Sequence, residues 1–132
     1  MFILICGLPR AGKTTYSQEY IDKYPIIHLD NCGANPYDGV ERRIKRMVDD
    51  IVVEGVYNRK SERIRILSHR KDDENKICIW LDTPQEVRQT RKGWRKDCDF
   101  PFEPPTFDEG WDEIIIIRGE HDVQSYRNEK QT

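Results

Sequence analysis

Two glycines near the amino end constrain this chain more than any other feature. Residues 7–14 read Gly-Leu-Pro-Arg-Ala-Gly-Lys-Thr, a G-x-x-x-x-G-K-T pattern that follows an apolar run at 2–6. Gly7 and Gly12 let the backbone curl so that successive N–H groups point at one anion. The helix predicted from Lys13 onward presents its first N–H groups to the same anion. The pattern therefore predicts a phosphate-binding loop on a strand–loop–helix unit.

Side chains of the same loop supply the other contacts that a nucleoside triphosphate needs. Lys13 is expected to bind the β- and γ-phosphates, and Thr14 to ligate Mg²⁺. Glu54 ends another apolar run, at 51–55, where such proteins place a carboxylate that reaches Mg²⁺, here through water. No N/T-K-x-D guanine signature is present, so ATP and Mg²⁺ are the expected ligands. The expected nucleotide contacts are Gly7, Leu8, Pro9, Arg10, Ala11, Gly12, Lys13, Thr14 and Thr15.

Apolar runs of strand length alternate with helical patterns along the 132 residues. This alternation is typical of a parallel sheet wrapped by helices. One helix is expected to bury Val40, Ile44, Met47 and Val48, and another, at 61–70, to bury Ile64 and Leu67. The sequence therefore predicts one α/β domain over 1–118, followed by a loosely held polar tail at 119–132. The expected strands are 2–6, 26–29, 51–55, 76–81 and a fully buried one at 113–118.

Composition indicates which partners and which cellular location to expect for the chain. The net charge of −2 gives no overall attraction to nucleic acid. No apolar stretch approaches the length of a membrane span, and the first one is too short for a signal peptide, so we expect a cytoplasmic protein without a membrane partner. The four cysteines contain no C-x-x-C pair, which favours free thiols. An open sheet edge would give the domain a reason to form a homo-oligomer.

A basic segment at about 84–96 is predicted to form a short helical lid. Residues 83–86, Thr-Pro-Gln-Glu, form a capping box with proline at the first helical position. Cations follow at helical spacing and would share one face, where their mutual repulsion favours a bound anion. The alternative is a basic face that only water covers. The cations are Arg88, Arg91, Lys92, Arg95 and Lys96.

With these features placed, the chain resembles the kinase domain of polynucleotide 5′-hydroxyl kinases, of the kinase–phosphatase type. The resemblance covers nearly the whole domain and rests on four motifs. They are the loop at 7–15, Asp30 at the tip of the second expected strand, Arg91 and Arg95 four residues apart, and the segment 102–111, Phe-Glu-Pro-Pro-Thr-Phe-Asp-Glu-Gly-Trp. It implies a P-loop kinase domain with a five-stranded parallel sheet flanked by helices, in which Asp30 is the general base and Arg95, with Arg91, holds the donor phosphates.

Two basic residues that often hold the acceptor in this family are absent from the matching positions of this chain. The family often carries Arg just before the Asp and a basic residue a few positions after it, whereas here Leu29 precedes Asp30 and Asn-Cys-Gly follows. Arg42, Arg43 or Arg59 would then hold an acceptor phosphate. The aromatic residues of 100–111 are expected either to stack on a terminal base or to pack into the core.

Three functions follow as expectations. The first is transfer of the γ-phosphate of ATP to the 5′-hydroxyl end of DNA or RNA. The second keeps the chemistry but takes a nucleotide, nucleoside or small metabolite as the hydroxyl acceptor. The third is a P-loop ATPase or nucleotide-binding switch without an acceptor.

Overall fold

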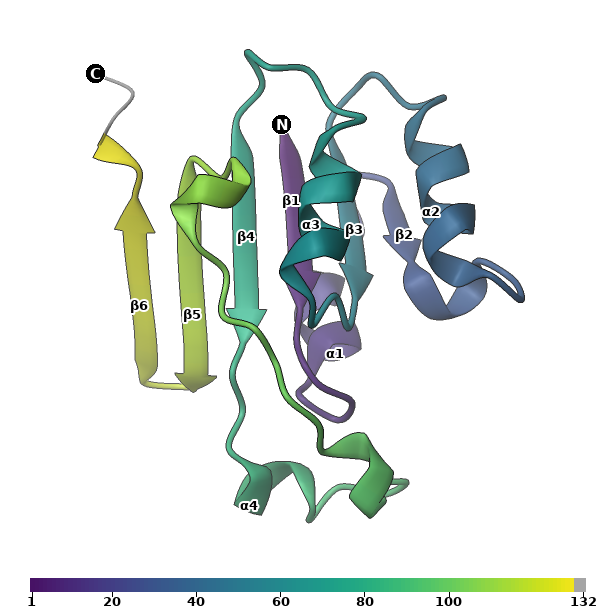
Figure 1. Ribbon diagram of the computed structural model, residues 1–132. Helices are drawn as coiled ribbons and strands as arrows, with labels where there is room; N and C mark the ends of the chain where they lie inside the picture. The colour runs from purple at the N-terminus through teal and green to yellow at the C-terminus, as the bar shows by residue number, and fades with distance from the viewer. Residues whose placement is uncertain (130–132) are drawn as a thin grey trace.

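The apolar run at 2–6 forms the strand on which the sheet is built. In the computed structural model, which describes residues 1–129, β1 pairs in parallel with β3 on one side and with β4 on the other. The described sheet has six strands in the order β2-β3-β1-β4-β5-β6 (Figure 1). The strands are β1 (Phe2–Cys6), β2 (Ile26–His28), β3 (Ile51–Gly55), β4 (Lys76–Leu81), β5 (Glu113–Gly119) and β6 (Asp122–Arg127).

Alternate residues of β1 face two separate hydrophobic layers. Phe2, Leu4 and Cys6 belong to one layer, which includes residues of α2 (Pro36–Ile44) and α3 (Lys60–Leu67). Ile3 and Ile5 belong to the other, against which the tyrosines of α1 (Lys13–Ser17) and of the 3₁₀ turn at Gln18–Tyr20 pack. The helices therefore cover both faces of the central strands (Figure 1). Among the described residues, no helix is both long enough and apolar enough to cross a bilayer.

The parallel arrangement brings the carboxyl ends of β1, β2 and β3 to one edge of the sheet. β1 leads into the loop at 7–14, β2 leads into a 3₁₀ turn over Leu29–Asn31 that carries Asp30, and β3 carries Glu54. The register pairs His28 with Glu54. In sheets of this kind, ligands bind at the carboxyl edge of the strands, so the topology places the predicted site residues at one edge.

The carboxyl-terminal part of the chain departs from expectation in two ways. Strands β1 to β5 are parallel as predicted, but residues 122–127, expected in a loose polar tail, form β6, which pairs antiparallel with β5. β5 is only partly buried rather than fully buried, because α1, α2 and α3 lie over the strands at the other end of the sheet (Figure 1). β6 is exposed along its whole length. Residues 130–132 of the expected tail lie outside the described part.

Two helices bury Val40, Ile44 and Leu67 as predicted, but not the whole predicted set. Val48 lies beyond the end of α2 and is 65% exposed, and Ile64 of α3 is 44% exposed. The interior position next to Ile64 is taken by Arg63, which is fully buried. A buried guanidinium requires charged and polar partners, and Arg63 finds them in Glu109 and in the carbonyl groups of Tyr57 and Pro104.

All four cysteines are free, as predicted. Cys6 and Cys78 lie on the neighbouring strands β1 and β4, and their sulfur atoms are 3.7 Å apart. Both side chains are completely buried. Burial is the largest cause of the raised pKa of Cys78.

Candidate active site

The loop at 7–14 adopts a conformation that its glycines allow. Gly12 has φ 102°, in the left-handed region that favours glycine. A side chain at Gly7 would place its Cβ atom 2.8 Å from the carbonyl oxygen of Leu81. Ala11 donates its N–H to the carbonyl of Leu8 at 3.1 Å, which closes a turn inside the loop. Arg10 lies between the two glycines at φ 67° and is therefore a non-glycine residue in the left-handed region.

Lys13 is a buried cation at this edge of the sheet, with 9% of its surface exposed. Its ammonium group donates a hydrogen bond of 3.0 Å to the carbonyl of Leu8, within the loop itself. Burial lowers the pKa of Lys13, and the negative charges of Glu54 and Asp30 oppose that change. Thr14 and Thr15 are exposed beside it. The loop and the start of α1 therefore present a buried ammonium group, bonded to the loop backbone, together with two exposed hydroxyl groups.

Two carboxylates face this loop across a cavity of about 1100 Å³. Glu54 is buried at 5% exposure, and its Oε2 atom lies 2.8 Å from Nδ1 of His28. Asp30 is exposed on its 3₁₀ turn. The structure thus brings together Lys13, Thr14, Asp30 and Glu54, which were predicted separately. His28 was not predicted, because only the register of β2 against β3 shows that it contacts Glu54.

The lid is not the continuous helix that its charge spacing predicts. α4 covers only Gln85–Arg88, and the chain then turns, with Gly93 at φ 89°. Arg88 points inward at 3% exposure, where it donates to Asp99 at 2.6 Å and to the carbonyl of Thr83 at 3.1 Å. The predicted face of five cations is therefore wrong. Because α4 stops at Arg88, it does not align the cations that follow. The sequence pattern did not reveal Asp99 as the partner of Arg88.

Part of the lid still contacts the phosphate-binding loop. Arg91 donates from Nη1 to the carbonyl of Arg10 at 2.6 Å, and Thr83 donates to the carbonyl of Ala11 at 2.7 Å. The guanidinium of Arg10 lies against Gly93, where a Cβ atom would be 2.6 Å from Nη2. Arg95, by contrast, is largely exposed and 3.7 Å from Asp97.

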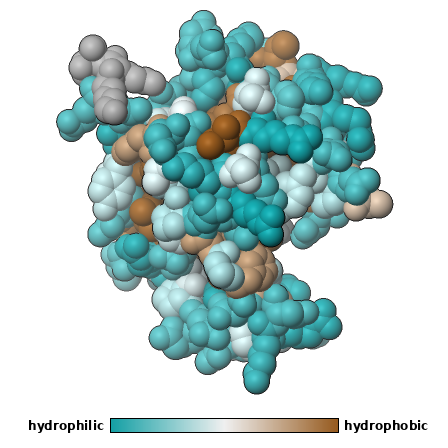
Figure 2. All heavy atoms as spheres, viewed as in Figure 1, coloured by the Kyte–Doolittle hydropathy of each residue, from teal (hydrophilic) through white to brown (hydrophobic). Residues whose placement is uncertain are grey.

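Arg91, Lys92 and Arg95 all line the same cavity as Lys13. Figure 2 shows the lower part of the molecule, where Figure 1 places α4, as a mostly hydrophilic lobe that stands out from the body of the domain. The structure therefore brings the predicted lid arginines to the predicted nucleotide cavity, although without a shared helical face.

The donor atoms at this edge suit Mg²⁺ bound with a nucleotide better than a metal held by protein alone. Among residues 1–129, no cluster of three or more His, Cys, Asp or Glu side chains could hold a metal ion. Mg²⁺ usually takes one or two protein oxygens and completes its shell with phosphate oxygens and water. The hydroxyl of Thr14 and the carboxylate of Glu54 are of the required type, so these residues fit the predicted role.

The segment that follows the lid is anchored in the core rather than open to a base. Phe102 stacks on Trp80 with ring centroids 5.1 Å apart, and Trp111 stacks on Phe2 at 6.2 Å. Glu109 binds Arg63 through two hydrogen bonds of 2.7 and 3.0 Å and accepts a third from Trp111. Core packing, the second of the two alternatives for these aromatic residues, therefore holds for Phe102 and Trp111. We call residues 98–111 the strap.

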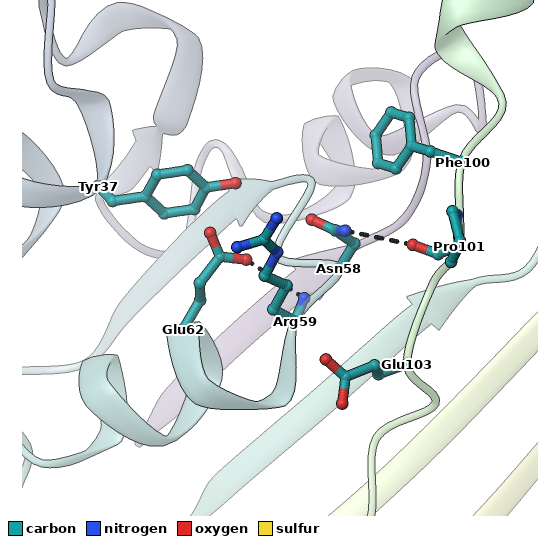
Figure 3. A pocket seen from close by; sticks show the side chains of 7 residues that line it. All are labelled: Tyr37, Asn58, Arg59, Glu62, Phe100, Pro101 and Glu103. Atoms are coloured by element: carbon teal, nitrogen blue, oxygen red, sulfur yellow. Dashed lines mark hydrogen bonds between the residues drawn. The ribbon is translucent and has the colours of Figure 1, made fainter.

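The basic residues considered for an acceptor phosphate lie apart from one another. Arg42 and Arg43 are exposed on α2, and Arg42 lines a separate cavity that also contains Glu41 and Arg65. Arg59 lines a third cavity, of about 600 Å³, between the loop after β3 and the strap (Figure 3). Of the three arginines, only Arg59 lies beside the strap.

Comparison with known proteins places the fold. No protein-family model matches the sequence, and no curated protein does either. A gluconokinase from Sinorhizobium meliloti 1021 is similar in structure over 77% of this chain and 67% of its own, with 15% identity and a TM-score of 0.53. Shikimate kinase from Aquifex aeolicus is similar over 92% of this chain and 89% of its own, with 14% identity and a TM-score of 0.50. At these identities the likeness concerns the fold alone: the chain shares the α/β fold of these two kinases.

Proposed function

We propose that the protein transfers the γ-phosphoryl group of ATP to a hydroxyl group of a small molecule. One observation carries the proposal: Lys13, Asp30 and Glu54, from three different segments, converge on one cavity beside a phosphate-binding loop. The kinase fold supports the same chemistry. Phosphoryl transfer needs positioning and charge stabilisation more than covalent help from the protein, and this set of residues can provide both.

Each residue has a role that its position allows. The N–H groups of the loop and the ammonium of Lys13 would bind the phosphates, with Lys13 exchanging its bond to Leu8 for a phosphate oxygen. Thr14 and, through water, Glu54 would hold Mg²⁺, which supplies positive charge to the transferring group. Arg91 and Arg95 would hold the donor phosphates during transfer, Arg91 from its present place at the loop.

Asp30 would act on the acceptor. The hydroxyl oxygen of the acceptor forms a bond to the γ-phosphorus while the bond to the β,γ-bridging oxygen breaks, and ADP leaves. The hydroxyl proton passes to the carboxylate of Asp30, which is exposed to the cavity and free to receive an acceptor. His28 would orient Glu54 through their 2.8 Å contact.

The nature of the acceptor separates the expectations drawn from the sequence. The named structural neighbours are kinases of small metabolites, gluconokinase and shikimate kinase. The aligned basic face that suggested a nucleic acid backbone is absent, because Arg88 is buried and the lid helix ends after it. Both points favour a small acceptor over a 5′-hydroxyl polynucleotide end.

The test is transfer from γ-labelled ATP with Mg²⁺ to separate panels of small hydroxyl compounds, nucleosides, mononucleotides and 5′-hydroxyl oligonucleotides. We expect label on small acceptors, its loss in Asp30→Asn with ATP affinity retained, and no activity in Lys13→Ala. Label on oligonucleotides would instead support a polynucleotide kinase. Label released only as free phosphate, unchanged by Asp30→Asn, would identify an ATPase or switch.

A further inference from the structure

A second cavity lies beside the nucleotide cavity and is separated from it by very little chain. Three segments contribute to both cavities: the segment after β2 through Asp30 and Tyr37, the loop after β3 through Val56 and Asn58, and the strap through Cys98 and Phe100. In the loop after β3 and in the strap these residues are two positions apart, which extended chain spans in about 7 Å. The two cavities are therefore neighbours along these segments.

The walls of this cavity are fixed. Asn58 donates from its side chain to the carbonyl of Pro101 at 3.2 Å, and Glu103 donates its N–H to the carbonyl of Asn58 at 2.9 Å. Deeper in the protein, Arg63 connects the strap to the loop after β3, because it donates hydrogen bonds to Glu109 and to the carbonyl of Tyr57. The cavity therefore lies between two segments that hydrogen bonds hold together. Its volume of about 600 Å³ is within the range of small-molecule sites.

On one side of the cavity, the carboxylate of Glu62 already accepts a hydrogen bond from the protein. Glu62 accepts the N–H of Arg59 at 3.2 Å. Burial raises the pKa of Tyr37 to about 12, and the charge and hydrogen bond of Glu62 act in the same direction. Figure 3 shows the hydroxyl of Tyr37, the carboxylate of Glu62 and the guanidinium of Arg59 gathered on this side, with the ring of Phe100 across the gap. Tyr37 stays a neutral phenol, and Glu62 fixes its position.

Two exposed residues of opposite charge, Arg59 and Glu103, line the cavity. Within the described part of the chain, neither Arg59 nor Glu103 takes part in an ion pair: the described pairs of this region are those of Lys60 with Asp108 and of Arg63 with Glu109. Together with Glu62, the lining carries two carboxylates and one guanidinium. A polyanion, such as a nucleic acid end or a phosphorylated sugar, would meet net negative charge there and beside the bound γ-phosphate.

We propose that this cavity binds the acceptor of the reaction proposed above, and that the acceptor is a small zwitterion. Its anionic group binds Arg59, its ammonium group binds Glu103, and its hydroxyl reaches Asp30. The inference rests on the proposed function for the transfer step, whose products are ADP and the phosphate ester of the zwitterion. It differs from that function in fixing where the acceptor lies and which charges it carries.

The experiment uses L-homoserine as the zwitterion and two compounds that each lack one of its charges. These are 4-hydroxybutyrate, without the ammonium group, and 3-amino-1-propanol, without the carboxylate. Shikimate and gluconate serve as further anionic acceptors. Binding to the whole protein with ADP and Mg²⁺ is measured by calorimetry, and phosphate transfer is measured with labelled ATP. We expect homoserine to bind and to react at least threefold better than either fragment.

Charge-removing variants then assign each end of the molecule. Arg59→Gln is expected to weaken homoserine about three- to tenfold and to leave 3-amino-1-propanol unchanged, and Glu103→Gln to leave 4-hydroxybutyrate unchanged or improved while weakening homoserine. Glu86→Gln, an exposed carboxylate on α4 that lines none of the three cavities, is the matched control and should change nothing.

The outcomes separate this inference from the proposed function. Efficient labelling of shikimate or gluconate in preference to homoserine would support the kinase and overturn the zwitterion site. Homoserine binding that both variants weaken, without any transfer, would support the site and overturn the kinase. Absence of homoserine binding, or binding that neither variant changes, overturns the inference whatever the activity.

Discussion

Replacing Arg10 with glycine is expected to make the protein more stable and its nucleotide site weaker. The backbone of Arg10 has φ 67°, where an L-residue with a side chain is disfavoured by about 1–2 kcal/mol relative to glycine. Glycine loses roughly 0.5–1 kcal/mol more conformational entropy on folding. The difference predicts that Arg10→Gly raises the free energy of unfolding by about 0.5–1 kcal/mol, which is a rise of about 2–4 °C in Tm.

The same substitution removes a cation from the nucleotide cavity, where Arg10 lies with Lys13 and Arg91. A hydrogen bond to a charged group contributes about 1.5–3 kcal/mol, so the Kd for ATP with Mg²⁺ should rise by roughly 10- to 150-fold. Contact with Gly93 is lost as well, which frees the lid from one of its attachments to the loop. Urea unfolding and calorimetric titration of ATP measure the two effects on the same preparation.

Arg10→Ala is the matched control. It removes the same guanidinium but keeps the strained backbone, so its ATP affinity should equal that of Arg10→Gly while its free energy of unfolding is lower by about 1 kcal/mol. The reasoning is refuted if the glycine variant is the less stable of the two. It is equally refuted if either variant binds ATP as tightly as the parent protein.

Three further perturbations test other parts of the structure. Arg63→Met leaves the buried carboxylate of Glu109 without its partner and should lower the free energy of unfolding by about 3–5 kcal/mol in urea, with partial recovery when Glu109→Gln is added. Burial raises the pKa of Glu41, but hydrogen bonds from His69 and Arg65 outweigh it and hold the pKa below the ordinary 4.5. This carboxylate therefore stabilises the fold above pH 4.5 and loses that effect as the pH falls through its folded pKa. Glu41→Gln should flatten this part of the acid unfolding curve, and an unchanged curve would contradict the assignment. Arg95→Ala should lower kcat by roughly 10³ with little change in ATP affinity, and equal losses in both would exclude a role confined to the transition state.

The sequence predicted the centre of the sheet well because the signals there are local. β1, β3 and β4 are short, strongly apolar runs bounded by turn residues, and their observed bounds match the predicted ones. The glycine spacing of the loop likewise fixes the backbone around Lys13 and Thr14, and the apolar run at 51–55 places Glu54 near the end of β3. Asp30 was placed by the same reasoning from the end of a strand.

What the sequence could not show depends on partners far along the chain. Arginine is rarely buried, so nothing in the sequence marked Arg63 as an interior residue, and its contact with Glu109, 46 residues away, makes the interior position possible. Arg88 was assigned to a cationic face from its helical spacing to the later cations, although Asp99 holds it in the interior. Strand β6 is polar, so no apolar run in the sequence predicts it, and it forms by pairing with β5.

The paired thiols of Cys6 and Cys78 give this protein a built-in reporter of its own unfolding. They sit at the middle of the sheet with no solvent access, so an alkylating reagent can reach them only when β1 and β4 separate. Cys98, half-buried at the start of the strap, should react from the native state or after a small local opening. The ratio of the labelling rate of Cys98 to that of Cys6 and Cys78 would measure, by mass spectrometry, how much more easily the lid region opens than the sheet. ATP should slow the labelling of Cys98 at concentrations that do not yet affect the labelling of Cys6 and Cys78.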